Sequence, residues 1–89
     1  MKATKIKMKS GCGESNNLCE IDSIYLEEIG IFFKKETIHD LLLNNPKSIY
    51  VDLYPYPVLQ PVVSSLGEKY VRSEPDSTEK DNLLNLPRD

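Results

Sequence analysis

The chain has 89 residues, of which 39% are apolar and 28% are charged. This length suits one compact domain and is too short for two, so we expect residues 1–89 to form a single domain. The 11 basic and 14 acidic residues give a formal charge of −3, which argues against a nucleic-acid partner because phosphates are bound by clustered lysine and arginine. No long apolar run follows the first lysines, so we expect no membrane partner and a cytoplasmic location.

The first predicted element is a strand over residues 3–9, ATKIKMK. Thr4, Ile6 and Met8 alternate with lysines, which is the period of two that is typical of a strand with one buried face. Residues 10–17 are rich in glycine, serine and asparagine and predict a loop. A second strand is expected over residues 19–26, and residues 31–34 form either a short third strand or a bulged continuation.

The one predicted helix lies in KETIHDLLLNNP and is about ten residues long. Ile38, Leu41 and Leu42 have the i, i+3, i+4 spacing of a single apolar stripe. A helix this short depends on tertiary packing, so we expect the stripe to lie on a sheet. His39 follows the first residue of that stripe, and we expect it at the edge of the helix or facing solvent.

The second half of the chain contains further strand patterns. KSIYVDLYPYP is the clearest of them, and EKYVRS predicts a short last strand. Between them lies VLQPVVSSLG, in which Pro61 indicates a sheet edge or a bulge because proline cannot donate to a strand ladder. The predicted fold class is α+β, with a small antiparallel sheet of order strand-strand-(strand)-helix-strand-strand packed on one helix, and with an ordered C-terminal segment.

Polar and aromatic side chains occupy one face of the clearest strand and the turn after it. They are Tyr50, Asp52, Tyr54 and Tyr56. The opposite face of the strand is aliphatic, so a helix covering that side would leave the tyrosines outward. Tyrosine is enriched in interfaces because it combines a large ring with a polar end. These four residues are our candidate interaction surface for a protein partner or a second copy; ordinary cross-strand packing and a platform for a small ligand are the alternatives.

Residues 70–87, YVRSEPDSTEKDNLLNLP, combine turn-forming residues with a closing leucine-proline pair. Together with the opening strand KATKIKMKSG and the helix KETIHDLL, this segment resembles a family of short bacterial proteins catalogued as domain of unknown function number 3892. The resemblance spans nearly the whole chain and implies a small bacterial or phage protein. That family has no assigned activity, so the resemblance implies a fold and brings no catalytic residue.

Leucines near the end of the chain indicate that residues 73–89 pack on the core. Leu83 and Leu86 stand three residues apart and would point inward together from a helical turn. Burying two leucines contributes about 3–5 kcal/mol before the cost of ordering them. We therefore expect this tail to close an open end of the sheet.

Polar residues are expected to hold the tail in place. Thr78 and Asp81 have the spacing of a capping box, so a helical turn would start near Glu79. Arg72 is placed to pair with Asp76 or with Asp81.

No residue pattern in the chain indicates a catalytic or metal site. A structural zinc site needs four ligands, and His39 is the only histidine that could join Cys12 and Cys19. We therefore expect both cysteines to be free thiols, with a disulfide or a metal site as alternatives. Glu27 and Glu28 would face opposite ways in extended structure and form a solvated charge run. We expect that the protein is not an enzyme and that it binds no cofactor.

The sequence therefore favours a non-catalytic binding or interaction module. A small-molecule or nucleotide-binding protein is the alternative, because a base could stack on the tyrosines. Single-stranded nucleic acid would need a basic groove beside the aromatic residues, and we expect the lysines at the start of the chain to be insufficient for it.

Overall fold

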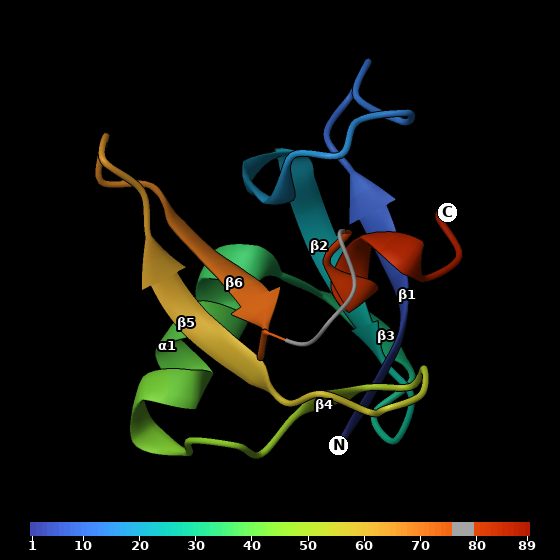
Figure 1. Cartoon of the computed structure of the whole chain (residues 1–89), viewed down its shortest axis with the longest axis vertical. Coiled ribbons are helices and arrows are strands. Elements are labelled where there is room, and N and C mark those ends of the chain that lie inside the picture. Colours follow the sequence, from blue (N-terminus) through green and yellow to red (C-terminus); the bar gives the residue numbers. More distant parts are fainter. Residues whose placement is uncertain (76–79) are drawn as a thin grey trace.

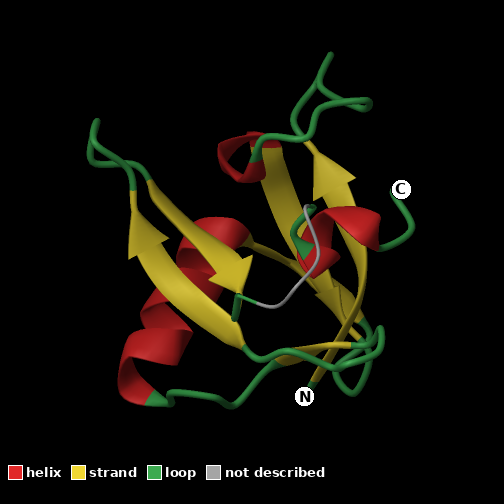
Figure 2. Cartoon of the chain, in the orientation of Figure 1, coloured by secondary structure: helices red, strands yellow, loops and turns green. Residues whose placement is uncertain are grey.

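The computed structural model describes residues 1–75 and 80–89 of the chain. This described part contains one α-helix and two β-sheets (Figures 1 and 2), which confirms the α+β class. In chain order the elements are β1 (Lys2–Met8), η1 (Leu18–Glu20), β2 (Ile21–Leu26), β3 (Ile31–Lys34), α1 (Lys35–Asn44), β4 (Tyr50–Val51), β5 (Leu59–Val63), β6 (Lys69–Ser73) and η2 (Asn82–Asn85). The elements η1 and η2 are short 3-10 helices.

The strands form a four-stranded sheet of order β3-β2-β1-β4 and a two-stranded sheet of β5 and β6. Neighbours pair antiparallel, except that β4 runs parallel to β1. The expected antiparallel sheet is thus divided in two, and one of its pairs is parallel. The parallel pair arises because α1 returns the chain to the end of the sheet at which β1 begins, so β4 starts there in the same direction as β1.

β4 has only two residues, Tyr50–Val51, although the segment around it has the clearest strand pattern. The chain turns soon afterwards, and the N–H of Tyr56 donates to the carbonyl oxygen of Leu53 at 2.6 Å. Pro55 and Pro57 continue the alternation of side chains but have no N–H to donate to a ladder. The pattern therefore predicted the strand correctly but not its length.

A β-bulge in β1 changes which residues face the core. The register shifts by one residue between Ala3 and Lys5, so Thr4 is the extra residue of the bulge. Ala3 is fully buried, and the hydroxyl of Thr4 instead donates to the carboxylate of Glu27 at 3.0 Å. The expectation that Thr4 faces the core was wrong, whereas Ile6 lies in the core as predicted.

The buried side of α1 differs from the predicted stripe. Its buried residues are Lys35, Ile38, His39 and Leu42, whereas Leu41 is half-buried. His39 is only 3% exposed, so the expectation of an edge or solvent-facing histidine was wrong. The reason is that α1 packs on β5 and β6 as well as on β2 and β3 (Figure 1), which covers a second side of the helix.

The C-terminal segment lies against both sheets. Its leucines Leu83, Leu84 and Leu86 are 0%, 4% and 4% exposed, and η2 contacts β6 and is seen over β1 and β2 in Figure 1. The chain then runs beside β1, where the N–H of Ile6 donates to the carbonyl oxygen of Pro87 at 3.0 Å. The N–H of Asp89 donates in turn to the carbonyl oxygen of Ile6 at 2.9 Å. The outer edge of β1 is therefore covered by β4 at one end and by the tail at the other.

Asp81 begins the helical turn η2. Its carboxylate accepts hydrogen bonds from the N–H of Leu83 at 2.9 Å and from the hydroxyl of Ser73 at 2.7 Å. The turn therefore starts after Asp81 and is tied to the end of β6. The sequence predicted a helical turn that starts near Glu79 after Thr78, and an ion pair of Arg72 with Asp76 or Asp81. Asp76, Thr78 and Glu79 lie outside the described residues.

The arginine that clamps the tail is Arg88. Its guanidinium donates to the carbonyl oxygens of Gly13 at 2.9 Å, Ser15 at 2.7 Å and Leu84 at 3.0 Å. Arg72 does not pair with Asp81, because its Nε donates to the carbonyl oxygen of Ser73 at 3.4 Å. One arginine thus connects the tail to the loop that follows β1.

Candidate functional site

The candidate surface of tyrosines is presented by β4 and by the turn that follows it. Tyr50 is half-buried in β4, whereas Tyr54 and Tyr56 in the turn are 84% and 54% exposed. The ring of Tyr56 stands edge-on to both others, with centroids 6.4 Å from Tyr50 and 6.1 Å from Tyr54. Edge-on contacts below about 7 Å are favourable for aromatic pairs, so the three rings support one another.

The backbone of Tyr56 adopts a left-handed conformation, with φ of 59°. Such a conformation is rare for a bulky residue and persists only where the surroundings enforce it. Here the N–H of Val51 donates to the carbonyl oxygen of Pro57 at 2.9 Å, and Tyr50 forms an antiparallel bridge with Val58. Strained residues of this kind concentrate at functional sites, so the conformation favours a binding role over simple packing.

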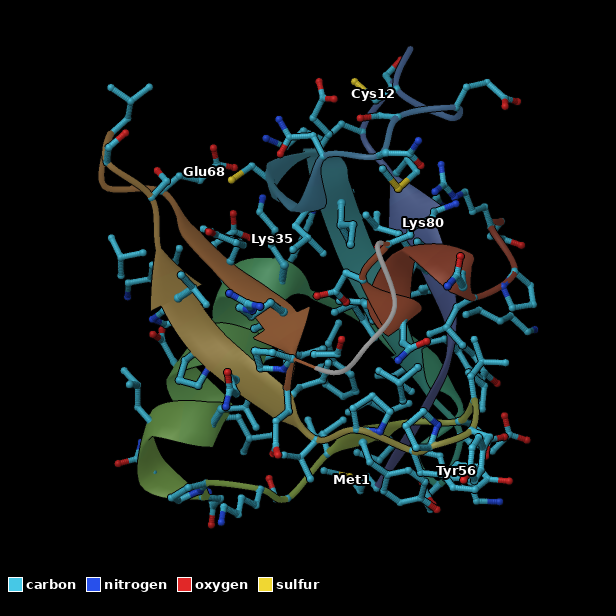
Figure 3. All side chains as sticks on the ribbon, viewed as in Figure 1. Met1, Cys12, Lys35, Tyr56, Glu68 and Lys80 are labelled. Carbon is cyan, nitrogen blue, oxygen red and sulfur yellow. The ribbon has the colours of Figure 1, made fainter. Side chains whose placement is uncertain are left out.

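Tyr56 contributes to the lining of two open grooves. The first has a volume of about 520 Å³ and is lined by Lys2, Tyr50, Asp52, Tyr56 and Val58. The second has a volume of about 300 Å³ and is lined by Pro55, Tyr56, Pro57, Val58, Glu74 and Pro75. Tyr56 and Val58 line both grooves, and the label in Figure 3 marks Tyr56 at the lower right of the molecule.

Each groove contains a carboxylate. Asp52 lines the first groove and Glu74 the second. Among the described residues, no basic side chain lies within 4.0 Å of either carboxylate. Lys2 lines the first groove as well. The two grooves therefore combine aromatic and proline surface with charges that are available to a ligand.

A larger cavity of about 690 Å³ lies beside η1 and η2. It is lined by Ser15, Asn16, Asn17, Leu18, Cys19, Tyr70, Lys80, Asp81 and Leu84. The carboxylate of Asp81 is already occupied by its bonds to Ser73 and Leu83, so it serves the fold.

A buried lysine joins three parts of the chain through ion pairs. The side chain of Lys35 is 3% exposed, and its Nζ lies 3.0 Å from a carboxylate oxygen of both Glu36 and Glu68 (Figure 3). Burial alone would lower the pKa of Lys35, but these two hydrogen bonds outweigh it and raise the pKa above 10.5. Glu68 also pairs with Lys9 at 2.9 Å, and the hydrogen bonds from Lys9 and Lys35 lower its pKa. This network connects the start of α1 with the loop before β6 and the end of β1.

Hydrogen bonds and burial determine the state of the thiols and of the histidine. Cys12 donates from Sγ to Glu20 at 3.2 Å, and this hydrogen bond is the main cause that raises the pKa of Cys12. Burial raises the pKa of Cys19, and both cysteines are free thiols in the structure. The Nδ1 of His39 lies 2.9 Å from the carbonyl oxygen of Tyr70, which can only accept, so this nitrogen carries a hydrogen.

Several of these structural residues carried no signal in the sequence. Arg88 and Glu68 act on partners that are distant along the chain, and no spacing marks them. Glu20 binds Cys12 and Ser15, which lie in the loop before it, but no motif marks that contact either. A lysine at the first position of a short helix, such as Lys35, is ordinarily solvated. Of the candidate residues that the sequence analysis named, the structure brings Tyr50, Tyr54 and Tyr56 together.

A family model described as "Protein of unknown function (DUF3892)" matches residues 4–87. The chain belongs to this family. The match spans the opening strand, the helix and the tail on which the resemblance rested. No curated protein and no solved structure matches the chain.

In residues 1–75 and 80–89, no helix is both long and apolar enough to cross a bilayer.

Proposed function

We propose that this member of the family is a non-catalytic binding module that engages an extended, proline-containing segment of a protein partner. The observation that carries the proposal is the pair of grooves that Tyr56 helps to line. Proline-rich segments dock in aromatic-lined grooves because their polyproline II conformation is largely formed before binding. Such a segment rises about 3.1 Å per residue with three residues per turn, so every third side chain faces the same way and can enter neighbouring grooves.

The charges of the grooves indicate what flanks the prolines. Asp52 and Glu74 each present a carboxylate without an ion-pair partner in the described part of the chain. A basic residue beside the prolines would satisfy one of them, and arginine can do so with two parallel hydrogen bonds. The protonated thiols and the buried His39 support a module without catalytic chemistry. The setting that the sequence favours is the cytoplasm of a bacterium, with the protein encoded by the bacterium or by a phage.

The proposal is tested by fluorescence polarisation with a labelled synthetic peptide that contains two prolines three residues apart and a flanking arginine. Tyr56→Asn removes the ring, and asparagine tolerates the left-handed backbone better than most residues. Leu66→Asn is the matched control, because Leu66 is 95% exposed in the loop between β5 and β6. We expect Tyr56→Asn to weaken peptide binding by about 30-fold, as truncation of an interface anchor does, and Leu66→Asn to bind as the wild type does.

Two results would contradict the proposal. Equal affinity of all three proteins for the peptide would remove Tyr56 from the binding surface. A wild-type dimer in light scattering that Tyr56→Asn converts to a monomer would assign the surface to a second copy of the chain.

A small-molecule or nucleotide ligand is the second candidate, favoured by the first groove. Its volume of about 520 Å³ is in the range of ligand sites, and its lining combines two tyrosines with Lys2. A ligand that binds only the folded state raises the melting temperature. In a thermal-shift screen of nucleotides, we expect such a ligand to stabilise the wild type and Leu66→Asn but not Tyr56→Asn.

A further inference from the structure

The outer face of the four-stranded sheet carries lysines beside aromatic rings. Residues that are directly opposite in an antiparallel pair share a face. One row across β1, β2 and β3 is Lys5, Tyr25 and Phe32, and the neighbouring row is Lys7, Ser23 and Lys34. The row of Ile6, Ile24 and Phe33 lies on the opposite face, toward the core. The lysine rows therefore lie on the face that the core does not use.

The ammonium groups of this face lie over the rings. The Nζ of Lys5 is 4.7 Å from the ring centroid of Tyr25, and the Nζ of Lys7 is 5.8 Å from that of Phe32. The two rings are 5.1 Å apart and nearly perpendicular, at 68°. Lys7 reaches Phe32 diagonally, because Phe32 lies two strands away in the neighbouring row. The aromatic pair and the two cations thus form one patch.

The patch is positive although the chain as a whole is negative. Among the described residues, no carboxylate lies within 4.0 Å of the Nζ of Lys5 or Lys7. Lys34, in the same row as Lys7, does have an acidic partner, because its Nζ lies 2.9 Å from the carboxylate of Asp22. Both Lys5 and Lys7 are exposed, and Tyr25 and Phe32 are half-buried beneath them. The local charge therefore favours an anionic ligand, in contrast to the formal net charge of −3.

We propose that this face binds single-stranded nucleic acid. Proteins that bind single strands combine cations along the backbone with aromatic rings on which bases stack, and both occur here within one patch. The flexible stems of Lys5 and Lys7 allow each ammonium to move from its ring to a phosphate, which frees the ring for a base. The sequence led us to expect no nucleic-acid partner, because the whole chain is negative and the first lysines were judged insufficient to form a basic groove beside aromatic residues.

An acidic protein segment explains the patch less well. It would use the two ammonium groups but would leave the paired rings of Tyr25 and Phe32 without a role. The surface is also separate from the grooves beside Tyr56, which share no lining residue with it. The proposal therefore stands or fails independently of the peptide site.

The test is fluorescence anisotropy with labelled oligothymidine and oligouridine of about ten nucleotides, each over a series of salt concentrations. The variant Lys5→Gln/Lys7→Gln removes both cations of the patch. The control Lys47→Gln/Lys69→Gln changes the net charge equally, at an exposed loop residue and at a lysine that pairs with Asp40. The variant Phe32→Leu keeps an apolar side chain but removes a stacking ring.

We expect both oligonucleotides to bind the wild type and the control, with affinity that falls as salt rises. The variant Lys5→Gln/Lys7→Gln loses two phosphate contacts, so it should bind more weakly. Its slope of log affinity against log salt should be smaller by about 1.4, at about 0.7 per contact for a single strand. Phe32→Leu should weaken binding with an unchanged slope. Tyr56→Asn should bind as the wild type does, and a difference between thymidine and uridine identifies the preferred sugar and base.

Three outcomes would overturn the proposal. The first is that neither oligonucleotide binds the wild type at low salt. The second is that the control lysine pair weakens binding as much as Lys5→Gln/Lys7→Gln does. The third is that polyglutamate binds as tightly as oligothymidine, which would assign the patch to an acidic protein.

Discussion

Arg88 is the parallel β-bridge partner of Ile6, so the end of the chain completes the edge of its first strand. An unpaired strand edge is a template for pairing with other chains, and proteins usually cover or charge it. In β1 the first two residues, Lys2 and Ala3, pair with β4, and Ile6 pairs with the tail. The tail therefore protects a strand edge in addition to filling the core.

The substitution Leu83→Ala tests most directly how much the tail contributes to the stability of the fold. The side chain of Leu83 is 0% exposed, so Leu83→Ala removes buried methyl groups and leaves a cavity. We expect the free energy of unfolding to fall by about 2–5 kcal/mol. Urea denaturation measures it, with Leu66→Ala as the control that should change stability by no more than about 0.5 kcal/mol. Similar values for the two variants would show that the tail contributes little to stability.

The guanidinium of Arg88 should order the loop between β1 and η1. It donates to the carbonyl oxygens of Gly13 and Ser15, which lie in that loop. Lysine has the charge but not the planar fork of donors, so Arg88→Lys should cost about 1–2 kcal/mol and speed amide exchange in residues 10–17. Hydrogen exchange by mass spectrometry measures the loop directly. Arg72→Lys is the control and should leave the exchange of residues 10–17 unchanged.

Glu68 should make stability depend on pH in the acid range. The hydrogen bonds from Lys9 and Lys35 lower its pKa in the folded state from the ordinary 4.5. A depressed carboxyl pKa contributes stability that is present above the unfolded pKa and is lost as the pH falls toward the folded one. The stability difference between wild type and Glu68→Gln should therefore shrink as the pH drops below 4.5.

Urea midpoints measured across this pH range check the prediction. Glu74→Gln is the control, because Glu74 forms no ion pair within the described residues. A difference between wild type and Glu68→Gln that stays constant from neutral to acid pH would count against the lowered pKa of Glu68.

Glu20 should hold Cys12 in its unreactive, protonated form. The hydrogen bond from the thiol to this carboxylate raises the pKa of Cys12 above its ordinary 9.0. In a Cys19→Ser background, Glu20→Gln should lower that pKa and speed alkylation by iodoacetamide at mildly alkaline pH, because only the thiolate reacts. Ser15→Ala is the control that loosens the same loop while keeping the carboxylate beside Cys12. If alkylation of Cys12 were accelerated equally in Glu20→Gln and Ser15→Ala, the cause would be opening of the loop and not a lower pKa of the thiol.

Local patterns of the sequence located most elements, because they depend on neighbouring residues. The spacing of Ile38 and Leu42 identified α1, and the alternation around Ile6 identified β1. What the patterns could not supply were contacts between distant segments. The burial of His39 follows from the second sheet, and the inward turn of Ala3 follows from a bulge that no residue type marks.

The candidate site was predictable in its members but not in its shape. The strand pattern selected Tyr50, Tyr54 and Tyr56, yet the second groove also needs Glu74 and Pro75, which follow β6. In the same way, the alternation of lysines in β1 was visible, but the register that puts Lys5 opposite Tyr25 is set by the hairpin. Grooves and patches of this kind are products of strand pairing and cannot be read from one segment.

The burial of the tail leucines determines when this protein can acquire its native state during synthesis. Leu83, Leu84 and Leu86 lie in the same core as Ala3 and Ile6. While those leucines remain inside the ribosomal exit tunnel, the emerged strands lack part of their apolar filling and one stretch of edge pairing. The native state therefore forms only once residue 86 has left the exit tunnel, and until then the nascent chain exposes apolar surface that makes it prone to aggregation.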